Sequence, residues 1–182
     1  YQMMETTDYC FSFFRKPIQN IEPIRAVGIV DVYRYIIGHY AQPQTENLRL
    51  MQSSPEAKRY KATHFDYCTF SGLFRKRNEK ELIMHSGLMC LDFDTELLFV
   101  SPSGNGLKWI IPVDLKGWEH SRYFKAVANC IKATGLPLVD MSGSDVARSC
   151  FLSYDPQAFI NHKYKDDVEE NIFRPRLGEC PF

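Results

Sequence analysis

Apolar and polar residues alternate along this chain in short blocks that predict several strands and a few helices. Strands are predicted where aromatic and aliphatic residues are dense, over 9–14, 65–70, 73–74, 82–85, 87–93, 97–100, 107–113, 138–140 and 147–154. Helices are predicted where apolar residues recur at helical spacing, over 22–40 and 119–134, and from Ser54-Pro55 onward, where a cap precedes a proline. The chain is therefore expected to combine strands and helices around one sheet.

The composition is that of a folded protein without an overall charge bias. Of the 182 residues, 45% are hydrophobic and 14% are aromatic, which suits one sizeable core. Lys and Arg together number 22, and so do Asp and Glu, so contacts with nucleic acid must come from local basic patches. Segments 58–61 and 75–77 are candidate template contacts, although charged runs of this kind usually form a solvated face.

Three further features concern the setting and the extent of the domain. The six cysteines are scattered without a Cys-x-x-Cys pair, which favours reduced thiols and a cytoplasmic protein. No run of 18 apolar residues is present, so no contact with a membrane is expected. After Asp155-Pro156 the chain becomes charged and loses periodicity. We therefore expect residues 1–160 to form one domain and residues 161–182 a tail, or a linker to a further domain.

Asp92 and Asp94 follow an apolar run and are the first candidates for chemistry. Side chains alternate along a strand, so both carboxylates point to one face while Leu91 and Phe93 point to the other. Two carboxylates on one face at a strand end supply hard oxygen ligands to a divalent cation. The plainer interpretation is a solvated strand face, which accounts for most patterns of this kind.

The segment 101–108, Ser-Pro-Ser-Gly-Asn-Gly-Leu-Lys, joins two predicted strands and is suited to an anion. Glycines allow backbone N–H groups to converge on a phosphate, while Ser103 adds a hydroxyl and Lys108 adds a positive charge. The alternative is a simple hairpin turn, because Asn105-Gly106 is a strong signal for a type I′ turn.

Asp140 ends a short predicted strand and is followed by Asp145 and Arg148. A third carboxylate beside Asp92 and Asp94 would complete a site for two cations about 4 Å apart, of the kind that assists phosphoryl transfer. Arg148 suits a phosphate or one of the carboxylates; a structural ion pair with Asp145 is the alternative.

The order of these features resembles the archaeo-eukaryotic primase superfamily: an acidic pair that ends a strand, Ser-Gly-x-Gly-x-Lys on the next hairpin, a helix and a further Asp. The run from His85-Ser86-Gly87-Leu88 to Phe151-Leu152-Ser153-Tyr154-Asp155-Pro156 is similar to one bacterial branch of it. That branch is the primase-polymerase-like N-terminal domain of mobile-element proteins, often fused to virulence-associated-E-type helicase modules and common in Bacteroides-like bacteria. With Lys61-Ala62-Thr63 and Ser71-Gly72-Leu73-Phe74, the resemblance covers most of residues 10–160.

The resemblance implies an α+β fold: an RRM-like, mostly antiparallel catalytic sheet with packed helices and an N-terminal αβ portion. It implies attack of a 3′-hydroxyl on the α-phosphate of a nucleoside triphosphate, with release of pyrophosphate. Mg²⁺ or Mn²⁺ would be the cofactor, and the partners would be a single-stranded or primed DNA template and a helicase domain or protein. The metal ligands would be Asp92, Asp94 and Asp140, and the nucleotide contacts would be Ser103, Gly104, Asn105, Gly106, Lys108 and Arg148.

The sequence departs from the family pattern at two places. Lys108 stands where many members have a histidine, so a point charge replaces a directional imidazole. Only eight residues separate Asp94 from Ser103, where the family usually carries a longer, helix-containing insert. Three functions stay open: a template-directed nucleotidyltransferase, a catalytically degenerate module that binds DNA or a nucleotide for a helicase, and an interaction domain with a solvated acidic edge. Metal-dependent incorporation that disappears in Asp92→Ala would distinguish the first from the others.

Overall fold

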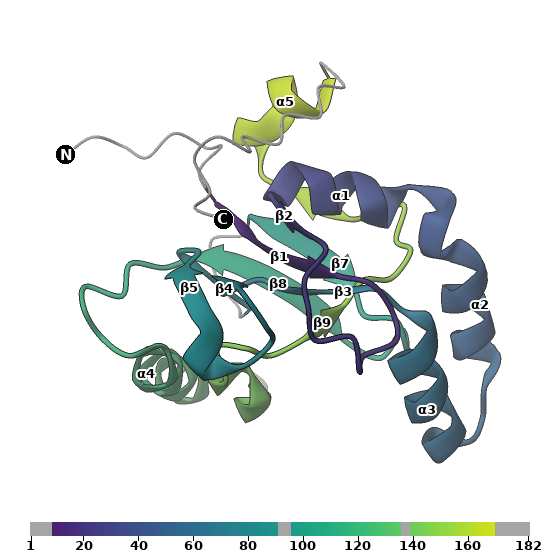
Figure 1. Cartoon of the computed structure of the whole chain (residues 1–182), viewed down its shortest axis with the longest axis horizontal. Coiled ribbons are helices and arrows are strands. Elements are labelled where there is room, and N and C mark those ends of the chain that lie inside the picture. Colours follow the sequence, from purple (N-terminus) through teal and green to yellow (C-terminus); the bar gives the residue numbers. More distant parts are fainter. Residues whose placement is uncertain (1–8, 91–95, 136–138, 170–182) are drawn as a thin grey trace.

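The computed structural model describes residues 9–90, 96–135 and 139–169, which form two four-stranded antiparallel sheets and a separate hairpin. The first sheet has the strand order β2-β1-β3-β9. Its strands are β1 (Phe11–Phe14), β2 (Arg25–Val27), β3 (Tyr67–Thr69) and β9 (Cys150–Phe151). All four residues of β1 are buried, so this strand is covered on both faces and lies at the centre of the domain (Figure 1).

The second sheet has the strand order β10-β7-β8-β6. Its strands are β6 (Leu88–Cys90), β7 (Leu97–Val100), β8 (Leu107–Pro112) and β10 (Phe159–Ile160). In the register of this sheet, Lys108 lies opposite Phe99, and Cys90 lies opposite Ile110. The separate hairpin consists of β4 (Gly72–Phe74) and β5 (Leu82–His85).

The helices lie on two sides of the sheets (Figure 1). On one side follow α1 (Ile29–Ile37), α2 (Gln42–Leu50) and α3 (Ser54–His64), while α4 (His120–Ala133) lies at the other end beside β5. The short α5 (Lys165–Glu169) packs against α1. Four 3-10 turns complete the chain: η1 (His39–Ala41), η2 (Glu79–Glu81), η3 (Met141–Ser144) and η4 (His162–Tyr164).

Three apolar clusters of described residues hold these layers together, and the smallest packs Phe74 and Leu82 of the β4–β5 hairpin against Val146 and Ala147. The main core joins both sheets to α1 and includes Phe11, Val32, Phe99, Ile110 and Cys150. The second cluster packs α4 onto the opposite face of the second sheet, with Met89, Ile111, Phe124, Ala128 and Ile131. Successive residues of a strand point to opposite faces, so Lys108 lies on the face of Ile110, which is the face turned toward the first sheet.

The helix predicted over 22–40 is wrong in its first part, where the chain forms β2 and begins α1 only at Ile29. Backbone pairing with β1 overrides the helical periodicity here, as tertiary hydrogen bonding often does. Gly28 precedes the helix, and its N–H donates to Asp31 Oδ2 at 2.9 Å. The helix was predicted from the spacing of Val27, Val30, Tyr33 and Ile37. The buried residues of α1 are instead Ile29, Val32 and Ile36, each one position before the last three of these.

The chain after β9 ties the two sheets together. Only Cys150–Phe151 is a strand within the segment 147–154, which was predicted to be extended throughout. Beyond it, the Leu152 N–H donates to the Asp66 carbonyl at 3.0 Å, and the Asp155 carboxylate accepts the Val100 N–H at 2.8 Å. These bonds carry the chain from the first sheet to β10, which pairs with β7 of the second.

Residues 161–169, which we expected to begin the tail, pack on the domain as η4 and α5. Tyr164 is buried in the main core, and its hydroxyl donates to Glu96 Oε2 at 2.7 Å. Lys163 forms an ion pair with the other oxygen of Glu96 at 2.5 Å. Turns as short as these give no periodic signal, which is why the sequence did not reveal them.

The predicted α+β class is confirmed, with antiparallel sheets, packed helices and an N-terminal αβ portion. Within the described ranges, the longest helices are too short and too polar to cross a membrane.

Candidate functional site

The loop between β7 and β8 is a hairpin turn that closes on itself. The Ser101 N–H donates to the Gly106 carbonyl at 2.7 Å, and the Gly104 N–H donates to the Ser101 carbonyl at 2.9 Å. Gly104 has φ +78°, a left-handed conformation that favours glycine. Asn105 and Gly106 do not adopt positive φ, so the hairpin interpretation is right but the expected type I′ turn is wrong.

Arg49 of α2 lies against this hairpin, a contact that the sequence did not predict. Its Nη2 atom is 3.4 Å from the Ser101 carbonyl, and a β-carbon added at Gly104 would lie 3.4 Å from its Nε atom. The Ser101 and Ser103 hydroxyls are 3.4 Å apart on the same turn. The described contacts of the hairpin tip are therefore with α2, and they place a guanidinium beside the serines and glycines predicted to contact a nucleotide.

Lys108 lies near other predicted site residues, because it is on the face of β8 that is turned toward the first sheet. Its positive charge acts on Asp140, on Cys90 and on Lys61, and changes the pKa of each. Arg148 acts on Asp140 and Lys61 in the same way. The structure thus brings together Lys108, Asp140 and Arg148, which were predicted from separate segments.

Asp140 is not the end of a strand, as we expected, but the cap of η3. Its Oδ1 accepts the Ser142 N–H at 3.0 Å, and its Oδ2 accepts the Ser142 hydroxyl at 2.8 Å. Short acidic side chains favour such local bonds to the backbone over a strand ladder. These two bonds, followed by the charges of Arg148 and Lys108, lower the pKa of the exposed Asp140 carboxyl. Asp140 is therefore a carboxylate at neutral pH.

Arg148 does not pair with Asp145, the structural alternative considered above. Among the described residues, the Asp145 carboxylate instead accepts the Ala147 N–H at 2.9 Å, and the Arg148 side chain is exposed. The guanidinium is therefore available to a phosphate or to Asp140.

Lys61 of α3 is a further cation at this site. The sequence did not single it out as a site residue and placed it only in the basic segment 58–61. Lys61 is half-buried, and its ammonium lies 5.8 Å from the centre of the Phe151 ring. Burial lowers the pKa of Lys61, and the charges of Lys108, Arg148 and Lys58 lower it further. Mutual repulsion of this kind places Lys61 within electrostatic reach of the other cations, and a cluster of cations suits a polyanion.

Asp92 and Asp94 lie outside the described residues, so their position relative to Asp140 stays a prediction. The last described residue of β6 is Cys90, whose thiol is hydrogen-bonded to that of Cys150. This bond lowers the pKa of Cys90, and the charge of Lys108 lowers it further, whereas Asp140 opposes the change. The end of β6 therefore lies within the electrostatic reach of both Lys108 and Asp140.

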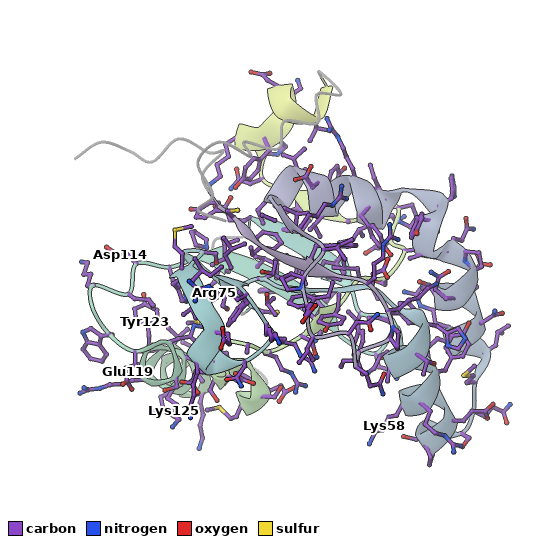
Figure 2. All side chains as sticks on the ribbon, viewed as in Figure 1. Lys58, Arg75, Asp114, Glu119, Tyr123 and Lys125 are labelled. Carbon is purple, nitrogen blue, oxygen red and sulfur yellow. The ribbon has the colours of Figure 1, made fainter. Side chains whose placement is uncertain are left out.

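The second basic segment, 75–77, makes structural contacts away from these groups. Lys76 pairs with Glu22 at 3.5 Å, and the Arg77 guanidinium lies 5.2 Å from the centre of the Tyr67 ring. Figure 2 shows Arg75 beside the β4–β5 hairpin, whereas Lys58 lies far from it on α3. Only the first of the two basic segments contributes to the candidate site.

Within the described part of the chain, no three His, Cys, Asp or Glu side chains are arranged to hold a metal ion. Asp140 fits such an ion in one respect, since it is an exposed, ionised carboxylate with oxygen lone pairs to spare. A complete ligand set would need Asp92 and Asp94 as well.

Comparison with known proteins gives one match. A family model described as the BT4734-like, N-terminal domain matches residues 93–159, more than a third of the chain. Neither a curated protein nor a solved structure matches. The matched part contains β7, the hairpin, β8, α4, η3 and β9. Over the segment that supplies Lys108, Asp140 and Arg148, the chain is therefore similar to the BT4734-like N-terminal domain.

Proposed function

We propose that this protein is a metal-dependent nucleotidyltransferase of the primase–polymerase type that acts in the replication of a mobile element. The observation that carries the proposal is that Lys108 and Arg148 lie within electrostatic reach of both the ionised Asp140 and the half-buried Lys61. These groups come from α3, β8 and the η3 loop, so their meeting is a property of the fold and not of one charged run. The family match over 93–159 supports it, because it spans two of these three elements.

The cations account for binding of a nucleoside triphosphate. Lys108 and Lys61 supply point charges, and Arg148 supplies a fork that matches two phosphate oxygens. Ser103, Gly104, Asn105 and Gly106 form the adjoining hairpin, where the serine hydroxyl offers a further donor. Charge that develops on the departing pyrophosphate would meet the same cations, which is how preorganised groups lower the barrier of phosphoryl transfer.

Asp140, with Asp92 and Asp94, would hold Mg²⁺ or Mn²⁺. The chemistry that the ion supplies when bound is neutralisation of the negative charge on the triphosphate. The chain's own part is to orient the triphosphate, so that a 3′-hydroxyl attacks the α-phosphate and pyrophosphate leaves on the opposite side. Ser142 fixes the Asp140 carboxylate through two hydrogen bonds, so this ligand would need little reorganisation.

The DNA template would follow α3 toward the site. Lys58 and Arg59 are exposed on this helix and precede the half-buried Lys61 by one turn or less. Exposed cations bind the backbone of a nucleic acid without regard to sequence, and their contribution falls as salt rises. A helicase domain or protein is the expected further partner.

Extension of a primed single-stranded template, with Mg²⁺ or Mn²⁺, tests the proposal. Wild-type protein should incorporate nucleotides, and Asp140→Asn and the double variant Asp92→Ala/Asp94→Ala should not. Asp114→Asn is the matched control, since it removes an exposed carboxylate that accepts the Lys116 N–H in the loop before α4. Incorporation that persists in both site variants would contradict the proposal.

A catalytically degenerate module that binds a nucleotide or DNA for a helicase is the second candidate. One observation favours it: the described part of the site contains three cations but only one carboxylate, a balance that serves binding even without chemistry. This candidate predicts tight binding of triphosphate without incorporation, in a protein whose folding is confirmed.

A further inference from the structure

Two histidines connect the β4–β5 hairpin to the loop that carries Asp140 and Arg148. His85 is the last residue of β5, His120 is the first residue of α4, and Gly143 belongs to η3. His85 Nε2 lies 3.0 Å from His120 Nδ1, and His120 Nε2 lies 3.0 Å from the Gly143 carbonyl oxygen. The Gly87 N–H donates to His85 Nδ1, also at 3.0 Å. We call these three hydrogen bonds the histidine relay.

The relay determines where each proton lies. A backbone N–H can only donate, so His85 Nδ1 accepts and the proton of this ring is on Nε2. That proton is donated to His120 Nδ1, which leaves the proton of His120 on Nε2 to be donated to the Gly143 carbonyl. All ring nitrogens are satisfied only when both histidines are neutral. A second proton on either ring would place two N–H groups against each other.

Gly143 is held from its other side as well. A β-carbon at this position would overlap the ring of Phe124, a buried residue of α4. The carbonyl is thus bonded to His120 while the α-carbon lies on an aromatic ring of the same helix. Gly143 is three residues after Asp140 and five before Arg148, and the Gly143 N–H donates to the Asp140 carbonyl at 3.3 Å. Anchoring Gly143 to α4 therefore positions both side chains.

The surroundings keep the pair neutral. Burial lowers the pKa of His85 to about 4, with help from the nearby His120, and burial also lowers the pKa of His120. The bond to Gly143 and the charge of Asp145 oppose the shift at His120. The flanking elements carry further charged groups: Glu119 precedes α4, Arg122, Lys125 and Lys132 lie on it, Glu81 precedes β5 and Arg75 follows β4. Glu119, Lys125 and Arg75 are labelled in Figure 2.

We propose that His85 and His120 are positioning residues, which hold the Asp140–Arg148 loop in place while both are neutral and displace it when either takes up a proton. The consequence for triphosphate binding rests on the proposed function, whereas the relay itself does not. A second proton on His120 would set its Nδ1–H against the His85 Nε2–H, so the two rings would separate. The loop bonded to His120 Nε2 would move with that ring and carry the carboxylate and the guanidinium away from Lys108. Binding of triphosphate would then weaken as the pH falls.

The first test is the nitrogen chemical shifts of the histidine rings in uniformly ¹⁵N-labelled wild-type protein, between pH 8 and pH 4. We expect His85 and His120 to be neutral at pH 7 with the proton on Nε2, and to take up a second proton at lower pH than an unfolded histidine, whose pKa is about 6.5. A proton on Nδ1 of either ring, or a charged ring at pH 7, would overturn the proposal. This readout needs no ligand and no variant.

The second test compares two variants by amide hydrogen exchange over 139–148 and by binding of ATP and dATP with Mn²⁺. His120→Leu removes the donor to Gly143, so exchange should accelerate and affinity at pH 7.5 should fall about tenfold, as for one lost hydrogen bond. His85→Gln retains a donor toward His120 but cannot be protonated, so affinity should stay near wild type at pH 7.5. At pH 4.5, closer to the pKa of His85, it should lose less affinity than wild type, and the comparison at one pH keeps the protonation state of the ligand the same for both proteins.

The possible outcomes separate the two proposals. If wild-type protein binds no triphosphate at pH 7.5, the proposed function fails, and the ring shifts and loop exchange still decide the relay. If His120→Leu folds and its loop exchange equals that of wild type, the relay does not position the loop and the inference is wrong. If His120→Leu does not fold, the ring shifts and the acid response of His85→Gln give the answer.

Discussion

The two basic segments of this chain, 58–61 and 75–77, look alike in sequence but serve the molecule in different ways. Lys61 of the first is half-buried beside Lys108 and Arg148, and its pKa registers both charges. In the second, Lys76 pairs with Glu22, and Arg77 covers the Tyr67 ring. A run of cations therefore becomes a candidate site only where the fold sets other cations beside it.

The second segment is still connected to the candidate site, but by hydrogen bonds of a neutral histidine and not by its own charges. It lies in the turn of the β4–β5 hairpin, and the last residue of that hairpin is His85. His85 and His120 link the hairpin to Gly143 and so to the loop of Asp140. The first segment thus supplies charge to the site, while the hairpin of the second supplies position.

The largest effect on activity is expected at Asp140, because this carboxylate lies near Lys108 and Arg148, the same cations that act on Lys61 of the first segment. Asp140→Asn should lower the rate of nucleotide incorporation at least about a hundredfold, the usual cost of losing one preorganised electrostatic group. Thermal stability should change little, because the side chain is exposed, the amide oxygen can still accept the Ser142 N–H, and the amide NH2 can donate to the Ser142 hydroxyl oxygen. Primer extension and a melting curve would measure the two effects. Incorporation at the wild-type rate would remove Asp140 from the site.

Neutralising one cation in each segment tests the comparison directly. Lys61→Met should weaken triphosphate binding about tenfold, the loss typical of one charge-assisted contact, and Arg75→Met should not change it. Both variants remove one positive charge, so a general effect of net charge would affect them equally. Equal losses, measured by titration calorimetry at fixed salt, would mean that the position of Lys61 in the fold is irrelevant.

Lowering the pH should destabilise the fold through His85, the histidine of the β4–β5 hairpin. The pKa of His85 is lowered to about 4 and that of His120 is lowered too, whereas an unfolded histidine has a pKa of about 6.5. Between these values the unfolded chain binds more protons, so the free energy of unfolding is highest above about pH 6.5 and declines as the pH falls toward 4.

Urea unfolding at a series of pH values would measure this decline, with an uptake of up to about one proton per histidine. His85→Gln should make the decline shallower, and the same change at the exposed His162 serves as the control. An unchanged slope in His85→Gln would show that His85 is not the group that titrates.

The smallest effect is expected at Arg77. Arg77→Met removes a cation from the face of Tyr67 and should cost about 0.5–1 kcal/mol of stability, the usual range for such a contact near the surface. Triphosphate binding and incorporation should stay at the wild-type level. A loss of binding as large as that of Lys61→Met would show that both basic segments face the ligand.

Several local features could be predicted from the sequence, because neighbouring residues determine them. The helix of 119–134 was expected within one residue of α4 at each end, since its apolar stripe and the following Gly135 lie in one stretch of chain. The β7–β8 hairpin was expected for the same reason, though not its turn type. Asp140 lies within electrostatic reach of Lys108 and Arg148, but it caps η3 and does not end a strand, because its bonds to Ser142 compete with extension. Its role as a metal ligand stays a prediction.

What only the tertiary structure decided are the contacts between distant segments. Segment 25–27 became a strand because β1 was there to accept its backbone bonds, although the apolar spacing favoured a helix. Lys61 became a site residue through the packing of α3, and His85 met His120 across 35 residues of chain. The residue pattern determines which segments favour helix or strand and which of their faces is apolar. A partly buried charge such as Lys61, or a hydrogen-bonded pair such as His85 and His120, exists only after folding has brought separate groups together away from water.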